Sequence, residues 1–183
     1  MSMAEARWVL RAATQGWHVR VESQQVFARL VSPQVSLRDV AQALQVLYRF
    51  HAAVEPLLLR HFDAVAALPY QPRLPCLCAD VLALGGEVPV LENSRAEVCA
   101  EAAWGYRYVV EGSMLGGAVI SRHLHKHLPN AKTVRYYSDV VPGSWPAFLG
   151  QMEVALATDA ARRLASDAAC QAFELLCEGC AAF

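Results

Sequence analysis

A histidine in the first predicted helix stands in line with three other polar residues that could do chemistry. Arg11, Thr14, His18 and Glu22 follow one another at i, i+3, i+7 and i+11, a spacing that places them along one helix face. A neutral imidazole is a good metal ligand, and a nearby carboxylate such as Glu22 can orient its ring. The guanidinium of Arg11 suits an anionic group. Two interpretations stay open: a solvated face with a hydrogen-bonded histidine, or a ligand histidine beside an anion-binding arginine.

The second stretch of interest, residues 105–120, places glycines within a helical pattern. Gly105, Gly112 and Gly116 recur at i, i+7 and i+11, so they share one face. Each costs about 1 kcal/mol relative to alanine in a helix interior. A face without side chains lets a flat molecule approach the backbone, and glycines also allow a kink. The alternative is close packing of two helices through small residues.

The rest of the chain predicts the helices that must position these residues, and almost nothing else. Sequences that alternate apolar and polar residues around Asn-Gly or Asp-Gly turns are absent. Pro56 should kink or break the helix that contains it, and Arg162 and Arg163 should lie in the last turn of theirs. We predict an all-α fold with a single domain over residues 1–183. The first expected helices span about residues 3–24, 23–30 and 37–68, the last of these capped by Ser36. The others run from Pro75 to Gly85-Gly86, from a capping box at Ser94 and Glu97 to a stop at Pro129-Asn130, from a cap at Ser144 to about Ala165, and from Ser166-Asp167 to about Cys180.

The composition excludes several classes of partner. The 183 residues are 55% hydrophobic and 18% charged, with a net charge of −1 and no basic run. The sequence therefore offers no cluster of basic residues to bind nucleic acid. No apolar stretch is long enough to span a bilayer, and the first residues lack a secretory signal pattern. We expect a soluble, cytoplasmic protein that binds neither nucleic acid nor membrane, with its six cysteines reduced.

Other histidines offer weaker signals. His123 and His127 share a helix face at i, i+4, so they could clamp a divalent metal. No carboxylate or cysteine is placed locally to complete such a site, and the favoured interpretation is a solvated face. His51 and His61 are interpreted as hydrogen-bonded surface or core residues.

Two motifs together resemble a known family. Residues 10–18, Leu-Arg-Ala-Ala-Thr-Gln-Gly-Trp-His, followed by Glu22, resemble the first-helix signature of haem oxygenases. Residues 108–117, Tyr-Val-Val-Glu-Gly-Ser-Met-Leu-Gly-Gly, resemble the glycine-rich distal helix of the bacterial branch, which includes enzymes that supply bilin to bacteriophytochromes. A third match, Tyr136-Tyr137 with Gly143, Trp145 and Phe148, is weaker. The resemblance runs from about Leu10 to Phe173.

The resemblance implies a multihelical fold with haem between the first helix and a kinked, glycine-rich distal helix. His18 would be the axial ligand of the haem iron, with Glu22 near its ring. Arg11 and Tyr108 would contact the haem propionates. On the distal side, Gly112, Gly116 and Gly117 would let the backbone approach the haem and O₂. Ser113 stands where the animal enzymes have an aspartate, so a distal water network could not depend on that carboxylate.

The implied activity uses haem as both cofactor and substrate and gives biliverdin, carbon monoxide and ferrous iron. Electrons would come from a separate ferredoxin or reductase, because no flavin or dinucleotide fingerprint is present. A bilin-accepting phytochrome is a further partner that the resemblance implies. The alternatives are a haem carrier of the same fold that does not turn over, and a thiamin-degrading enzyme of similar fold, which would need an active cysteine.

Overall fold

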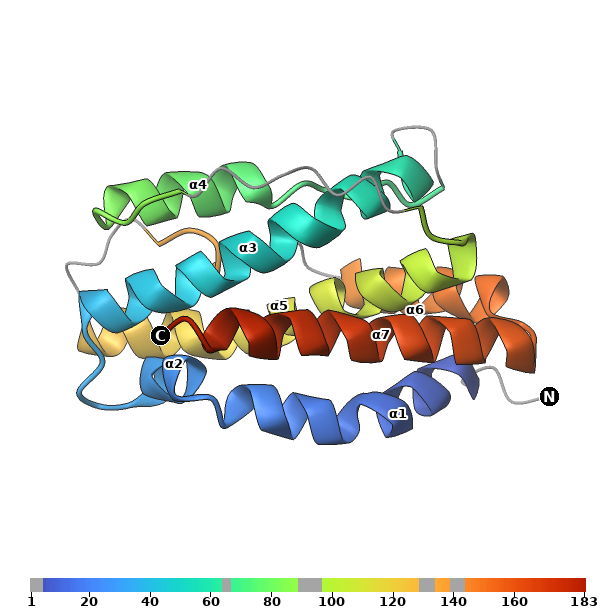
Figure 1. Cartoon of the computed structure of the whole chain (residues 1–183), viewed down its shortest axis with the longest axis horizontal. Helices are drawn as coiled ribbons and strands as arrows, with labels where there is room; N and C mark the ends of the chain where they lie inside the picture. Colours follow the sequence, from blue (N-terminus) through green and yellow to red (C-terminus); the bar gives the residue numbers. More distant parts are fainter. Residues whose placement is uncertain (1–4, 64–66, 89–96, 129–133, 139–143) are drawn as a thin grey trace.

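The protein is built from helices throughout the part that is described, as the sequence predicts. The computed structural model describes residues 5–63, 67–88, 97–128, 134–138 and 144–183 (Figure 1). None of the helices in these ranges is long and apolar enough to cross a membrane. The elements are α1 (Glu5–Glu22), α2 (Gln25–Ala28), the 3₁₀ helix η1 (Arg29–Val31), α3 (Leu37–His61), α4 (Leu74–Ala83), α5 (Ala100–His127), α6 (Ser144–Ala155) and α7 (Asp159–Cys180).

The last helix, α7, is the centre of the packing. It contacts α5, α1 and α3, and Figure 1 shows it crossing the molecule with α1 on one side and α3 and α4 on the other. Its buried side is rich in alanine, which lets neighbouring helices come close. At Gly105 of α5 a Cβ atom would collide with the backbone carbonyl of Ala165. Close packing through small residues is therefore the correct interpretation for Gly105.

The predicted boundary between the last two helices is wrong. The break lies before α7, where the Thr158 hydroxyl caps the helix by accepting from the Ala161 amide at 3.1 Å. Ser166 is instead buried inside α7. Arg162 lies in the first turn of α7, where Asp159 (2.9 Å) and Glu5 of α1 (3.1 Å) offset its unfavourable position near the helix N-terminus.

Two other helix ends differ from prediction. α3 begins at the expected Ser36 cap, continues through Pro56 and ends at His61, about seven residues early. The helix survives the proline because the flanking residues pack into the core, including Val54 and Leu58. α5 begins at Ala100, after the predicted capping residue Glu97, and its N-cap Cys99 makes no side-chain cap bond. Ser94, Pro129, Asn130 and Gly143 lie outside the described residues.

The N-terminus of α1 is capped by a residue from another helix. The Glu153 carboxylate of α6 accepts from the amides of Ala6 (2.9 Å) and Arg7 (2.8 Å). A carboxylate there satisfies otherwise unpaired amides and complements the helix dipole. α1 is thereby fixed at the end opposite to His18.

We predict that Glu153→Gln lowers the free energy of unfolding by about 1 kcal/mol, because the amide keeps the shape but loses the charge. In thermal unfolding this is a drop of about 2–4 °C for a chain of this size. Glu87→Gln, at an exposed position after α4, is the matched control. Equal melting temperatures for the two variants would contradict the capping role.

Candidate functional site

His18 lies on an exposed face of α1. Its Nδ1 is 3.4 Å from Glu22 Oε2, and both side chains are more than half exposed. The ring stands edge-on to Phe173 of α7, with centroids 6.0 Å apart. Because Glu22 lies at Nδ1, the ring nitrogen without a partner among the described residues is Nε2. The structure therefore joins the two residues as the spacing predicted.

The polar face of α1 formed by Arg11, Thr14, His18 and Glu22 is exposed except at Thr14. Thr14 is buried, donates to the Leu10 carbonyl at 2.8 Å and lies against the hydroxyl of Tyr108 of α5. Burial raises the pKa of Tyr108, and the Thr14 hydroxyl and the charges of Arg11 and Arg7 oppose part of that rise. The phenol and two arginines thus share one neighbourhood. Arg7 is a member of this group that the sequence did not single out.

The glycines of α5 differ in the atoms that surround them. A Cβ on Gly112 would meet the Trp145 ring at 3.6 Å, and one on the buried Gly117 would meet the Tyr137 carbonyl at 3.5 Å. A Cβ on Gly116 would meet no described atom within 4 Å. Two large apolar side chains beside it, Leu115 and Val119, are about half exposed. We call residues 112–119 the open stretch of α5.

Contacts at each end of the open stretch fix its position against the first part of the chain. Before it, Tyr108 meets Thr14 of α1. After it, His123 Nε2 lies 2.8 Å from the carbonyl oxygen of Ser32, just beyond η1. Along the chain, His18 lies four residues after Thr14, between the Thr14 contact and η1. This arrangement can hold a flat, apolar ligand with a histidine available to it and cations near Tyr108.

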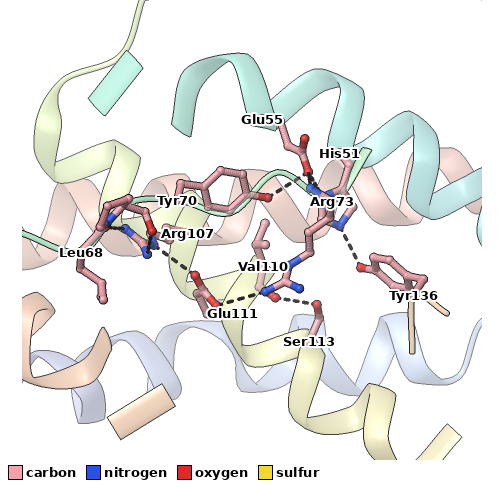
Figure 2. A network of polar contacts seen from close by, with 11 residues as sticks. His51, Glu55, Leu68, Tyr70, Arg73, Arg107, Val110, Glu111, Ser113 and Tyr136 are labelled. Atoms are coloured by element: carbon pink, nitrogen blue, oxygen red, sulfur yellow. Dashed lines mark hydrogen bonds and ion pairs between the residues drawn. The ribbon is translucent and has the colours of Figure 1, made fainter. Parts of the chain in front are cut away.

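A buried polar network supports α5 from its other side (Figure 2). His51 of α3 is fully buried, with Nδ1 at 2.9 Å from Glu55 Oε1 and Nε2 at 2.8 Å from the hydroxyl of Tyr136. Glu55 also accepts from the Tyr70 hydroxyl at 3.0 Å and from the amide of Arg73 at 2.7 Å. The interpretation of His51 as a hydrogen-bonded core residue agrees with these contacts.

The proton positions in this network follow from its acceptors. Burial alone would raise the pKa of Glu55, but hydrogen bonds from His51 and from the backbone outweigh it, so the pKa is lowered. Burial lowers the pKa of His51. Because the carboxylate can only accept, neutral His51 donates from Nδ1 and accepts the Tyr136 hydroxyl proton at Nε2. The Tyr136 oxygen in turn lies beside Ser113 of the open stretch.

Charged residues extend the network along α5. Glu111 pairs with Arg73 (3.5 Å) and with Arg107 (3.2 Å), and buried Arg107 donates to the carbonyl of Leu68 at 2.6 Å (Figure 2). Ser113 donates to its own helix at the Val110 carbonyl, 2.7 Å away, which leaves its oxygen as an acceptor. The sequence analysis missed these ion pairs.

We predict that Tyr136→Phe lowers the free energy of unfolding by about 1–3 kcal/mol, because it leaves the fully buried His51 Nε2 without its donor. The neighbouring Tyr137→Phe is the matched control. Tyr137 is equally buried, but its hydroxyl has no hydrogen-bond partner among the described residues. Chemical denaturation should separate the two variants, and a Tyr137→Phe loss as large as that of Tyr136→Phe would contradict the assignment.

Known proteins that resemble this chain in sequence or in structure share one name, heme oxygenase. The chain is 40% identical to a heme oxygenase of Xanthomonas campestris pv. campestris (strain 8004) over a 133-residue alignment, which covers 68% of this chain and 79% of that protein. It superposes with a TM-score of 0.74 on the NO- and CO-bound heme oxygenase from Neisseria meningitidis, at 26% identity, covering 98% of this chain and 94% of that one. The heme oxygenase from Leptospira interrogans, at 18% identity with full coverage of both chains, shares the fold with a TM-score of 0.71. No family model matches.

Proposed function

Because the chain belongs to the haem oxygenase family, we propose that it cleaves haem with O₂ and external electrons to biliverdin, carbon monoxide and ferrous iron. The observation that carries the proposal is the Thr14–Tyr108 contact, which joins α1 one turn before His18 to α5 one turn before Gly112. Haem degradation is the family's activity; the products and the roles of individual residues are proposed here.

The described residues fit haem on three counts. His18 has an exposed ring with Nε2 free to bind iron. Gly116 has space for a flat molecule against the backbone, and the exposed Leu115 and Val119 offer it apolar surface. Cations for the propionates would come from Arg11 and Arg7, whose charges act on Tyr108. When bound, haem would supply both the iron that activates O₂ and the porphyrin that is cleaved.

On the proximal side, Glu22 would hold the His18 ring by accepting from Nδ1, which keeps the ring in the tautomer that binds iron through Nε2. The edge of Phe173 would limit rotation of that ring. Arg11 and Tyr108 would fix how the haem is turned in its plane, and thus which porphyrin edge reaches the distal helix.

On the distal side, absence of a side chain at Gly116 would leave room for O₂ close to the α5 backbone. Gly112 and Gly117 face Trp145 and Tyr137, and these contacts would keep α5 in place. Ser113 would hold water at its hydroxyl oxygen, supported through Tyr136 by the hydrogen bonds of His51 and Glu55. A neutral serine with this support would stand in for the aspartate of the animal enzymes.

The electron donor would be a separate ferredoxin or reductase, and a bilin-accepting phytochrome would be a recipient of the product. The test of the main proposal is titration of the protein with haemin, followed by ascorbate under air. The haem absorption band should appear on titration and then give way to the spectrum of biliverdin. A band that persists under reductant and air would instead establish a haem carrier.

We predict that Arg11→Ala weakens haem binding only a few-fold, because an exposed ion pair contributes about 0.2–1 kcal/mol. Its larger effect should be a changed mixture of biliverdin isomers, since the haem could take a second rotation in its site. The control is Arg20→Ala, an exposed arginine that stacks on Trp17. Chromatography of the products checks the result; unchanged affinity together with an unchanged isomer mixture would count against the contact.

A further inference from the structure

A buried acid on α4 has no role in the proposed function. Asp80 is 1% exposed. Its Oδ2 accepts from the backbone amides of Arg135 and Tyr136, each at 2.8 Å. The amide of Ser138 donates to the Arg135 carbonyl at 2.9 Å, which closes a turn over residues 135–138. Asp80 therefore holds the first two amides of this turn from a distant part of the chain.

Stability alone does not account for a carboxylate at this position. Burial raises the pKa of Asp80, and the two amide hydrogen bonds and the charge of Arg135 offset only part of that rise. The ionised form is therefore less favourable in the folded protein than in water. An ionised acceptor does, however, form shorter and stronger hydrogen bonds to amides than a neutral one. The carboxylate thus favours a precise position of the turn.

The turn carries two buried tyrosines that contact the polar network and α5. Tyr136 places its hydroxyl 2.8 Å from His51 Nε2 (Figure 2) and beside Ser113. The Tyr137 carbonyl lies 3.5 Å from where a Cβ on Gly117 would be. The two phenol rings contact each other edge to face, with centroids 5.3 Å apart. A displacement of the turn would therefore move the Tyr136 hydroxyl relative to both His51 and Ser113.

From these contacts we infer that Asp80 is a positioning residue for the distal side of the site. Through the amides of Arg135 and Tyr136 it sets the place of the Tyr136 hydroxyl, which donates to His51 and lies beside Ser113. Resting on the proposed function, Asp80 thereby supports the water that Ser113 would hold near O₂. It acts through the turn and not on the haem.

The placement of Tyr136 is tested on the haem-free protein by nitrogen NMR of the His51 ring. The chemical shift of Nε2 depends on whether this atom accepts a hydrogen bond. Asp80→Ala should move the Nε2 signal towards its value in Tyr136→Phe, which lacks the donor hydroxyl. Asp80→Asn keeps a neutral acceptor for the two amides, so it should move the signal in the same direction by a smaller amount.

Asp39→Ala is the matched control, because Asp39 is also a buried acid and accepts from the Ser36 amide at the start of α3. It lies about 18 Å from His51 along the helix. Asp39→Ala should lower the melting temperature and leave the His51 signal in place. A wild-type signal in Asp80→Ala, or an equal shift in Asp39→Ala, would overturn the inference. If Asp80→Ala does not fold, a wild-type signal in Asp80→Asn would overturn it.

The effect on haem cleavage is measured separately, with haemin and then ascorbate under air. Asp80→Ala should bind haem with wild-type affinity through His18. It should form biliverdin roughly ten-fold more slowly or worse, because small misplacements around a reacting centre are costly. Asp39→Ala, assayed well below its melting temperature, should keep the wild-type rate.

A wild-type rate in Asp80→Ala, with its His51 signal shifted, would overturn the role of Asp80 on the distal side. If the wild type makes no biliverdin, the proposed function fails. The His51 signal of the haem-free variants would then still decide whether Asp80 places Tyr136.

Discussion

Replacing His18 with alanine is expected to abolish the absorption spectrum of histidine-ligated haem and to stop biliverdin formation. The loss should be nearly complete because no second histidine is placed on the described part of α1 to replace it. Stability without haem should stay within about 0.5 kcal/mol of the wild type, because the side chain is exposed and its partner Glu22 is more exposed still. Added imidazole should partly restore the spectrum by occupying the vacated space.

The control for His18→Ala is His125→Ala, an exposed histidine on α5. Haemin titration, followed by ascorbate under air, should give wild-type behaviour for this variant. If His18→Ala shows the same spectrum and turnover as the wild type, His18 is not the axial ligand. If His125→Ala loses both, the measurement reports general damage and the His18 result carries no assignment.

Local signals predicted the helices well, and their ends less well. Ser36 was expected as a cap from its place before the apolar stripe, and in the structure its hydroxyl and Asp39 form a capping box. Thr158 was missed because Ser166-Asp167 offers an equally good cap in the sequence. Only packing decides between them: Ser166 faces the interior of the bundle, and Arg162 finds Glu5 of α1.

The buried network could not be predicted, because its members come from distant parts of the chain. Glu55 meets His51 four residues away, but it also meets Tyr70 and Arg73, and His51 meets Tyr136 across 85 positions. A signal was present: Glu55 sits in the apolar stripe of α3. An acidic residue in such a stripe predicts a buried partner, although not which one.

The candidate site was predictable to the extent that it depends on helix periodicity. His18 and Glu22 lie together because i and i+4 residues share a face. The glycines were placed on one face correctly, but periodicity does not say what lies opposite. Gly105 faces the Ala165 backbone, and Gly116 faces open space. Two glycines that are equivalent in the sequence therefore have different uses.

This difference makes Gly105→Ala and Gly116→Ala a matched pair. In Gly105→Ala the new methyl group collides with the Ala165 carbonyl. Such overpacking costs about 1–3 kcal/mol, so the haem-free protein should melt several degrees lower. In Gly116→Ala the methyl group meets no described atom. Because alanine favours a helix over glycine, stability should rise by up to about 1 kcal/mol.

The biliverdin yield should fall in Gly116→Ala and not in Gly105→Ala, the reverse of their effects on stability. If the Gly116 backbone faces haem and O₂, a methyl group there takes up that space. Gly116→Ala should still bind haem through His18, yet convert much less of it to biliverdin, with peroxide released instead; Gly116→Val should be worse. Gly105→Ala, assayed well below its melting temperature, should retain its yield per folded molecule. The measurements are melting without haem and biliverdin yield with it. A Gly116→Val protein with normal stability and full biliverdin yield would remove the open stretch from the proposed site. The valine side chain would then have contacted neither haem nor O₂.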